Sequence, residues 1–69
     1  MNEFRFEVKY MLKIYYNLHI IKQMKKLLVD SVEIKEGPDS KEYALATQDY
    51  EETKESIKII KNMVSTYYN

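Results

Sequence analysis

Few residues of this 69-residue chain could take part in chemistry: one histidine, His19, and an acidic group formed by Glu51, Glu52 and Glu55. A nucleophilic enzyme needs an activated side chain, a base and a third group that orients the base. Cysteine is absent, and no aspartate or serine stands at a spacing that would bring it to His19. We therefore expect His19 to be an imidazole on a helix surface, and we expect no catalytic residue.

Metal and cofactor sites are not indicated either. His19 and Gln23 do not form a ligand pair, and the acidic group lacks a second cluster that would complete a metal site. The single glycine, Gly37, precedes Pro38, which is typical of a turn and not of a phosphate-binding loop that opens a helix. The sequence thus predicts a protein without enzymatic activity, metal, cofactor or small-molecule ligand.

The basic residues are concentrated near the N-terminus. Residues 1–29 contain six basic and two acidic residues, a net charge of +4, whereas residues 30–69 contain five basic and nine acidic residues, a net charge of −4. Lys22, Lys25 and Lys26 follow one another at i, i+3 and i+4, so on a helix they could contact phosphates together. A small nucleic-acid-binding transcriptional regulator that uses this basic patch is therefore the alternative function.

An apolar line on the predicted first helix favours protein binding instead. Tyr16, Ile20, Met24 and Leu27 stand at i, i+4, i+8 and i+11, roughly 100° or more around the helix from its expected core stripe. That stripe consists of Met11, Ile14, Leu18, Ile21 and Leu28. A chain this short has few elements with which to cover both sides, so we predict a protein interface at the apolar line. The competing interpretation is that the second helix and a sheet of the same chain cover it.

Two kinds of element are predicted to position these residues. Residues 4–10 alternate apolar and charged side chains, which is typical of a strand, whereas a helix would stack the like charges of Arg5, Lys9 and Lys13. Residues 11–29 form the first helix. Alternation in residues 32–35 and 42–46, on either side of Gly37 and Pro38, predicts a β-hairpin.

A second helix follows, capped by Thr47 or Asp49. Its buried stripe is expected to comprise Tyr50, Thr53, Ile57, Ile60, Val64 and Tyr67. Residues 64–68 form either the end of this helix or a short last strand, which would give the element order of a ferredoxin-like fold.

The fold predicted from these elements is a single α+β domain over residues 1–69, with the order β-α-β-β-α and two helices on one face of an antiparallel sheet. The alternative is an all-α helical hairpin that forms a dimeric bundle. In that fold Asp39 and Glu42 would form a capping box, and the second helix would carry a stripe at positions 43, 46, 50, 53, 57, 60, 64 and 67.

Composition narrows the functional class. Apolar residues make up 45% of the chain and charged residues 32%, and there is neither a membrane-spanning run nor a leader segment, so we expect a cytoplasmic protein that does not bind membranes. Lys, Ile, Tyr and Asn supply 28 of the 69 residues, a bias that follows A/T-rich codons and suggests a phage or another mobile element.

We therefore predict a protein-binding module, a small regulator or inhibitor that occludes a surface of its partner. Its partner is either a second copy of the chain, giving a homodimer, or a host protein. Anti-defence proteins of the anti-CRISPR type perform this kind of task, and the comparison with them is one of analogy.

Overall fold

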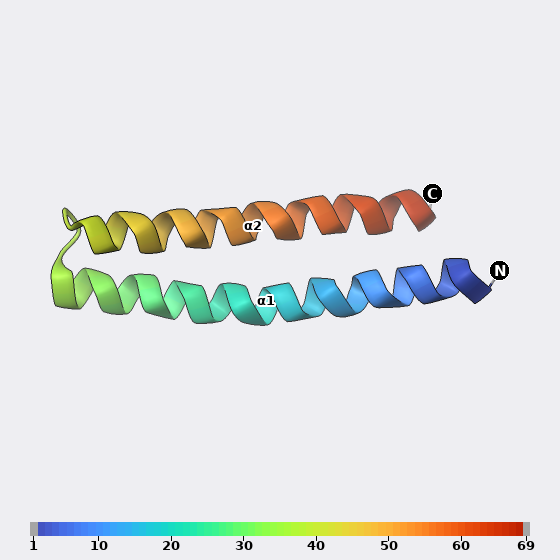
Figure 1. Cartoon of the computed structure of the whole chain (residues 1–69), viewed down its shortest axis with the longest axis horizontal. Coiled ribbons are helices and arrows are strands. Elements are labelled where there is room, and N and C mark those ends of the chain that lie inside the picture. The colour runs from blue at the N-terminus through green and yellow to red at the C-terminus, as the bar shows by residue number, and fades with distance from the viewer. Residues whose placement is uncertain (1, 69) are drawn as a thin grey trace.

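Two long helices make up the structure. The computed structural model describes residues 2–68, and side chains from Glu7 to Thr66. Helix α1 spans Asn2–Glu36 and helix α2 spans Lys41–Tyr68. They run antiparallel, side by side, and a short turn joins them at one end of a hairpin that measures 52 by 15 by 13 Å (Figure 1). No strand occurs in residues 2–68, so the predicted α+β fold is wrong, and the architecture is the helical hairpin considered as the alternative.

Residues 4–10, predicted as a strand, belong to α1. Their alternation is short, and Val8 also begins a helical pattern that continues through Met11, Tyr15 and Leu18 at spacings of three and four. The like-charged pair Lys9 and Lys13 is tolerated because both side chains are exposed to water, which screens their repulsion.

The predicted β-hairpin is also helical on both sides of the turn. Val32 and Ile34 would share one face of a strand, but on a helix they lie about 200° apart. Val32 is accordingly half-buried toward α2, while Ile34 is 87% exposed. The preference of both residues for strands is outweighed because they lie in a long helix that packs against α2.

The turn itself has a clear chemical basis. Gly37 ends α1 with φ at +91°, and its N–H donates to the carbonyl of Glu33 at 3.0 Å. Pro38 has no N–H, so a second bond of this kind to α1 cannot form. The hydroxyl of Ser40 then accepts a hydrogen bond from the N–H of Tyr43 at 3.1 Å, which makes Ser40 the N-cap of α2. The capping box expected from Asp39 and Glu42 is replaced by this cap.

Helix α2 is longer at both ends than the second helix of the predicted α+β fold. It begins at Lys41, before Thr47 and Asp49, and it continues to Tyr68, so residues 64–68 are not a strand. Near this end the hydroxyl of Thr66 donates to the carbonyl of Asn62 at 2.9 Å, inside the helix.

The hairpin has one narrow core, the seam between the helices. On α1 the seam residues repeat at alternating spacings of three and four: Val8, Met11, Tyr15, Leu18, Lys22, Lys25, Val29 and Val32. On α2 the expected stripe faces the seam, with Thr53 and Ile57 buried and Tyr50, Ile60 and Val64 half-buried; the side chain of Tyr67 lies outside the described set. The expected stripe of α1 is wrong in part, because Ile21 and Leu28 are 40% and 52% exposed whereas Val29 is buried.

Candidate functional site

The predicted interface residues lie on the side of α1 that faces away from α2. Tyr16, Ile20, Met24 and Leu27 are between 57% and 69% exposed. At 100° per residue, Ile20 and Leu27 point about 180° away from the centre of the seam. Ile34 continues the same line one heptad beyond Leu27. We call these five residues the outer face of α1.

The apolar surface continues from the outer face around one flank of α1. Ile21 and Leu28 lie beside it, and both are exposed. Across the seam, α2 contributes the exposed side chains of Leu45 and Met63. By contrast, only three apolar side chains with described positions are buried: Val8, Val29 and Ile57. The hairpin therefore presents much more apolar surface to solvent than it encloses.

The predicted basic patch is divided by the structure. Lys25 points across the seam, where its Nζ lies 2.9 Å from Oδ1 of Asp49. Lys26 instead pairs with Asp30, one turn along the same helix, at 3.1 Å. The hydrogen bond and the charge of Asp30 raise the pKa of Lys26 above its usual value. Lys22 takes part in neither pair; it lines one hollow together with Lys26, Leu27 and Tyr50, so of the three lysines only Lys25 is directed across the seam to Asp49.

Lys22 belongs to a different basic feature, a groove along one side of the seam. The groove has a volume of about 440 Å³ and is open to solvent. Helix α1 contributes Tyr15, His19 and Lys22, and α2 contributes Tyr50, Ile57, Lys54, Lys58 and Lys61. We call this the lysine groove. The sequence alone did not reveal the lysine groove. The spacing of Lys54, Lys58 and Lys61 at i, i+4 and i+7 does place these three lysines on one side of a helix.

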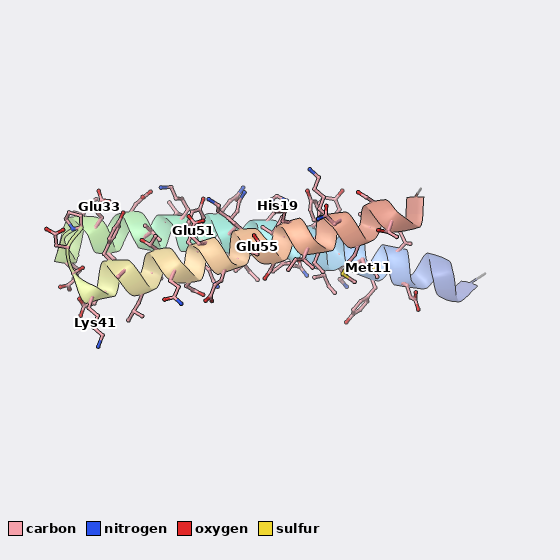
Figure 2. The ribbon with its side chains drawn as sticks, turned by 90° about the horizontal axis from the view of Figure 1, so that it is seen from above. Met11, His19, Glu33, Lys41, Glu51 and Glu55 are labelled. Carbon is pink, nitrogen blue, oxygen red and sulfur yellow. The ribbon has the colours of Figure 1, made fainter. Side chains whose placement is uncertain are left out.

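His19 lies at the wall of the lysine groove. Its ring packs edge-on against Tyr15, with 4.5 Å between the ring centroids and 75° between the planes. Figure 2, seen from the side of α2, places His19 near the middle of the hairpin and close to the level of Glu55. The imidazole is half-buried: it lies at the surface of α1, and its environment there is an aromatic contact at the wall of a basic groove.

The tyrosine on the opposite wall is held by a lysine. The Nζ of Lys54 lies 5.1 Å from the centroid of the Tyr50 ring, a cation–π contact, and 3.3 Å from Oε2 of Glu51. Tyr50 is half-buried. These contacts place an aromatic ring in the wall of the groove near the middle of α2.

Two further classes of site do not occur among the described residues: a metal-binding cluster and a membrane-spanning helix. No group of three or more acidic or histidine side chains in residues 7–66 is arranged to hold a metal ion. Over the described residues, neither helix contains a stretch long and apolar enough to cross a bilayer.

Comparison with known proteins adds no relative to these observations. No protein-family model, curated protein or solved structure matches the chain. The function must therefore be inferred from the surfaces of the hairpin.

Proposed function

We propose that the protein is a protein-binding module without enzymatic activity, and that the outer face of α1 is its docking surface. Its first partner is a second copy of the chain. The observation that carries this proposal is the exposure of Tyr16, Ile20, Met24 and Leu27 as one continuous apolar line, directed away from the only other helix of the hairpin.

The energetic reason is the small size of the core. Two helices can share only one interface, so each helix leaves its opposite side to solvent. The single core of a domain of this length rarely supplies more than about 3–5 kcal/mol, and association is a common way to add to it. Each exposed leucine, isoleucine or methionine gains roughly 1.5–3 kcal/mol when it is transferred from water to an interface. An uncovered outer face is therefore a strong driving force for association.

The spacing of the outer face suits another helix as its partner. Ile20, Met24, Leu27 and Ile34 follow one another at intervals of four, three and seven residues. This is the repeat by which helices pack at about 20° in four-helix bundles. The hairpin is 52 Å long, which gives a helix of a second copy the length of a four-helix bundle along which to pack.

Charge complementarity favours a second copy in the reverse orientation. Residues 22–53, which form the half of the hairpin near the turn, contain five basic and eight acidic residues, net −3. The other half, near the termini, contains six basic and three acidic residues, net +3. Two hairpins placed side by side with their turns at opposite ends bring each negative half next to a positive one.

The concentration dependence of the molecular mass tests the proposal. Sedimentation equilibrium of the wild type is expected to give about twice the 8.3 kDa chain mass at micromolar concentration. The thermal midpoint should rise with protein concentration because association stabilises the fold. A mass of one chain, together with a midpoint independent of concentration, would refute self-association.

Variants locate the interface. Ile20→Glu combined with Leu27→Glu should reduce the mass to that of one chain, because two charges would be buried without partners. Asn62→Glu together with Ser65→Glu, exposed positions on α2, is the charge-matched control and should remain associated. If the outer-face variant remains associated, the interface lies elsewhere on the hairpin.

The role as a regulator or inhibitor from a phage or another mobile element stays a prediction of the sequence. In that role the outer face would cover an apolar helical surface of a host protein and exclude its natural ligand. Mixing the protein with such a target would distinguish the two kinds of partner. A host protein that competes for the outer face should convert the homodimer into a complex with one copy of each chain.

A further inference from the structure

We infer that the lysine groove binds the phosphate backbone of a single-stranded nucleic acid. The inference is independent of self-association, because it concerns another side of the hairpin. It rests on four lysines that converge from two helices on one groove: Lys22, Lys54, Lys58 and Lys61.

Lys22 is the least expected of these residues. It occupies a seam position on α1, where a regular hairpin would place an apolar side chain, and it is half-buried there. The next lysine in the seam, Lys25, is compensated by Asp49, but Lys22 has no carboxylate at ion-pair distance among the described side chains. A lysine without a counter-charge at a seam position departs from the apolar pattern of the helix, and departures of this kind are typical of functional sites.

The other lysines of the groove add to its positive potential. Lys58 and Lys61 also have no ion-pair partner among the described side chains, and Lys54 is shared between Glu51 and the ring of Tyr50. Four ammonium groups that line one groove raise its potential and attract anions. Phosphates that enter the groove would reduce the repulsion between the four ammonium groups. They would also release the cations bound to the nucleic acid, which favours binding.

The layout of the lysines suits a chain of phosphates better than a single compact anion. Lys54, Lys58 and Lys61 follow α2 over about 10 Å, with rises of about 6 and 4.5 Å between neighbours. A row of this length can contact successive phosphates of an extended strand. The tyrosines Tyr15 and Tyr50 line the same groove, and aromatic rings of this kind stack on bases regardless of sequence.

Acidic residues on the outer side of α2 favour a single strand over a duplex. Glu55 lies along α2 on the side turned away from α1 (Figure 2), and Glu51 stands at the outer rim of the groove, where it pairs with Lys54 at 3.3 Å. A duplex is much wider than the groove, so it would extend over α2 and meet these carboxylates. A single strand can remain between the helices, where the lysines are.

The outer face and the lysine groove can be used together. The groove residues of α1 are Tyr15, His19 and Lys22, whereas the apolar surface extends from Ile20 around the opposite flank to Ile21 and Leu28. The two surfaces meet only at Leu27, which shares a hollow with Lys22 and Tyr50, so a second copy seated on the opposite flank would leave Lys54, Lys58 and Lys61 accessible.

Fluorescence anisotropy with a labelled oligothymidylate of about twelve nucleotides tests the inference. The full-length protein should bind it at about 50 mM salt, and log K should fall against log salt with a slope of about −2 to −3, as for three or four phosphate contacts. The double variant Lys58→Gln, Lys61→Gln should weaken binding and reduce the slope by about 0.7 for each lost lysine. The control Lys35→Gln, Lys41→Gln removes two exposed lysines near the turn and should bind like the wild type.

Four results would overturn the inference. The first is no binding at low salt, and the second is equal loss of affinity in both double variants. The third is displacement of the oligonucleotide by inorganic pyrophosphate at an equal concentration of phosphate groups, which would show a site for small phosphates and not for a strand. A duplex of the same length should bind more weakly than the single strand, and tighter duplex binding would also contradict the proposed geometry.

Discussion

Lys25 of α1 and Asp49 of α2 are 24 positions apart in the chain, yet the Nζ of Lys25 donates a hydrogen bond to Oδ1 of Asp49 at 2.9 Å. The two other ion pairs described in this hairpin, Lys26 with Asp30 and Lys54 with Glu51, each lie within one helix. The ion pair between Lys25 and Asp49 therefore links the two helices directly, at the edge of the seam.

The contribution of this pair to stability should be small. Both side chains are partly exposed, and pairs of this kind contribute roughly 0.2–1 kcal/mol. A double-mutant cycle with Lys25→Met and Asp49→Asn, measured by urea unfolding at one protein concentration, should give a coupling energy in that range. The coupling should shrink in about 1 M salt because ions screen the charges. A coupling that salt leaves unchanged would contradict the partly exposed geometry.

Gly37→Ala should destabilise the hairpin by about 1 kcal/mol or somewhat more, because a Cβ is unfavourable at positive φ. No atom lies within 4 Å of the Cβ that alanine would add, so the effect isolates the backbone conformation. Gly37→Asn should cost less, since asparagine tolerates this conformation better. Thermal unfolding provides the measurement. Asp39→Ala, in the same turn, is the control, and an equal loss in both variants would contradict the special role of Gly37.

Ser40→Ala should destabilise α2 by about 1 kcal/mol, because the N–H of Tyr43 loses its hydrogen-bond acceptor. Ser40→Asp should retain most of the stability, since a carboxylate accepts the same bond and complements the positive end of the helix. Urea unfolding followed by circular dichroism measures both. Ser31→Ala, at an exposed position in α1, should be close to neutral. An unchanged midpoint in Ser40→Ala would show that Ser40 is not the operative cap.

Thr47→Val should stabilise the protein by about 1 kcal/mol. The hydroxyl oxygen of Thr47 is buried and has no hydrogen-bond partner in the described structure, so its replacement by a methyl group removes a desolvation penalty at nearly constant volume. Thr66→Val is the matched control, because the hydroxyl of Thr66 donates to Asn62 and its residue is exposed. Differential scanning calorimetry would compare the two, and a lower midpoint for Thr47→Val would indicate an unseen hydrogen bond.

The sequence predicted α2 better than α1. The stripe of α2 repeats every three and four residues over most of the helix, so its helical period is clear, and the burial of Thr53 and Ile57 confirms its central part. In α1, residues near each end also fit a period of two. Phe4 to Tyr10 and Val32 to Lys35 alternate over only a few residues, too few to distinguish a strand from a helix without knowing what packs against them. Both segments are helical.

The two candidate surfaces also differ in how far the sequence alone predicts them. The outer face of α1 depends on spacing within one helix, so Tyr16, Ile20, Met24 and Leu27 could be grouped from the sequence. The lysine groove combines Lys22 with Lys54, Lys58 and Lys61, more than thirty positions away. No local pattern links these residues. In the local pattern that does exist, Lys22 and Lys26 line one hollow, whereas Lys25 pairs with Asp49 across the seam.

The sequence by itself determined the turn at Gly37 and Pro38, the apolar line on α1 and the shortage of core, because each depends on neighbouring residues or on composition. Only the tertiary structure decided the fold class, since packing of two full-length helices outweighs the strand preference of short segments. It also decided the charge distribution. Along the sequence, residues 1–29 have a net charge of +4 and residues 30–69 a net charge of −4. Because α2 runs antiparallel to α1, Lys54, Lys58 and Lys61 lie beside the first half of α1, and the acidic residues are concentrated near the turn.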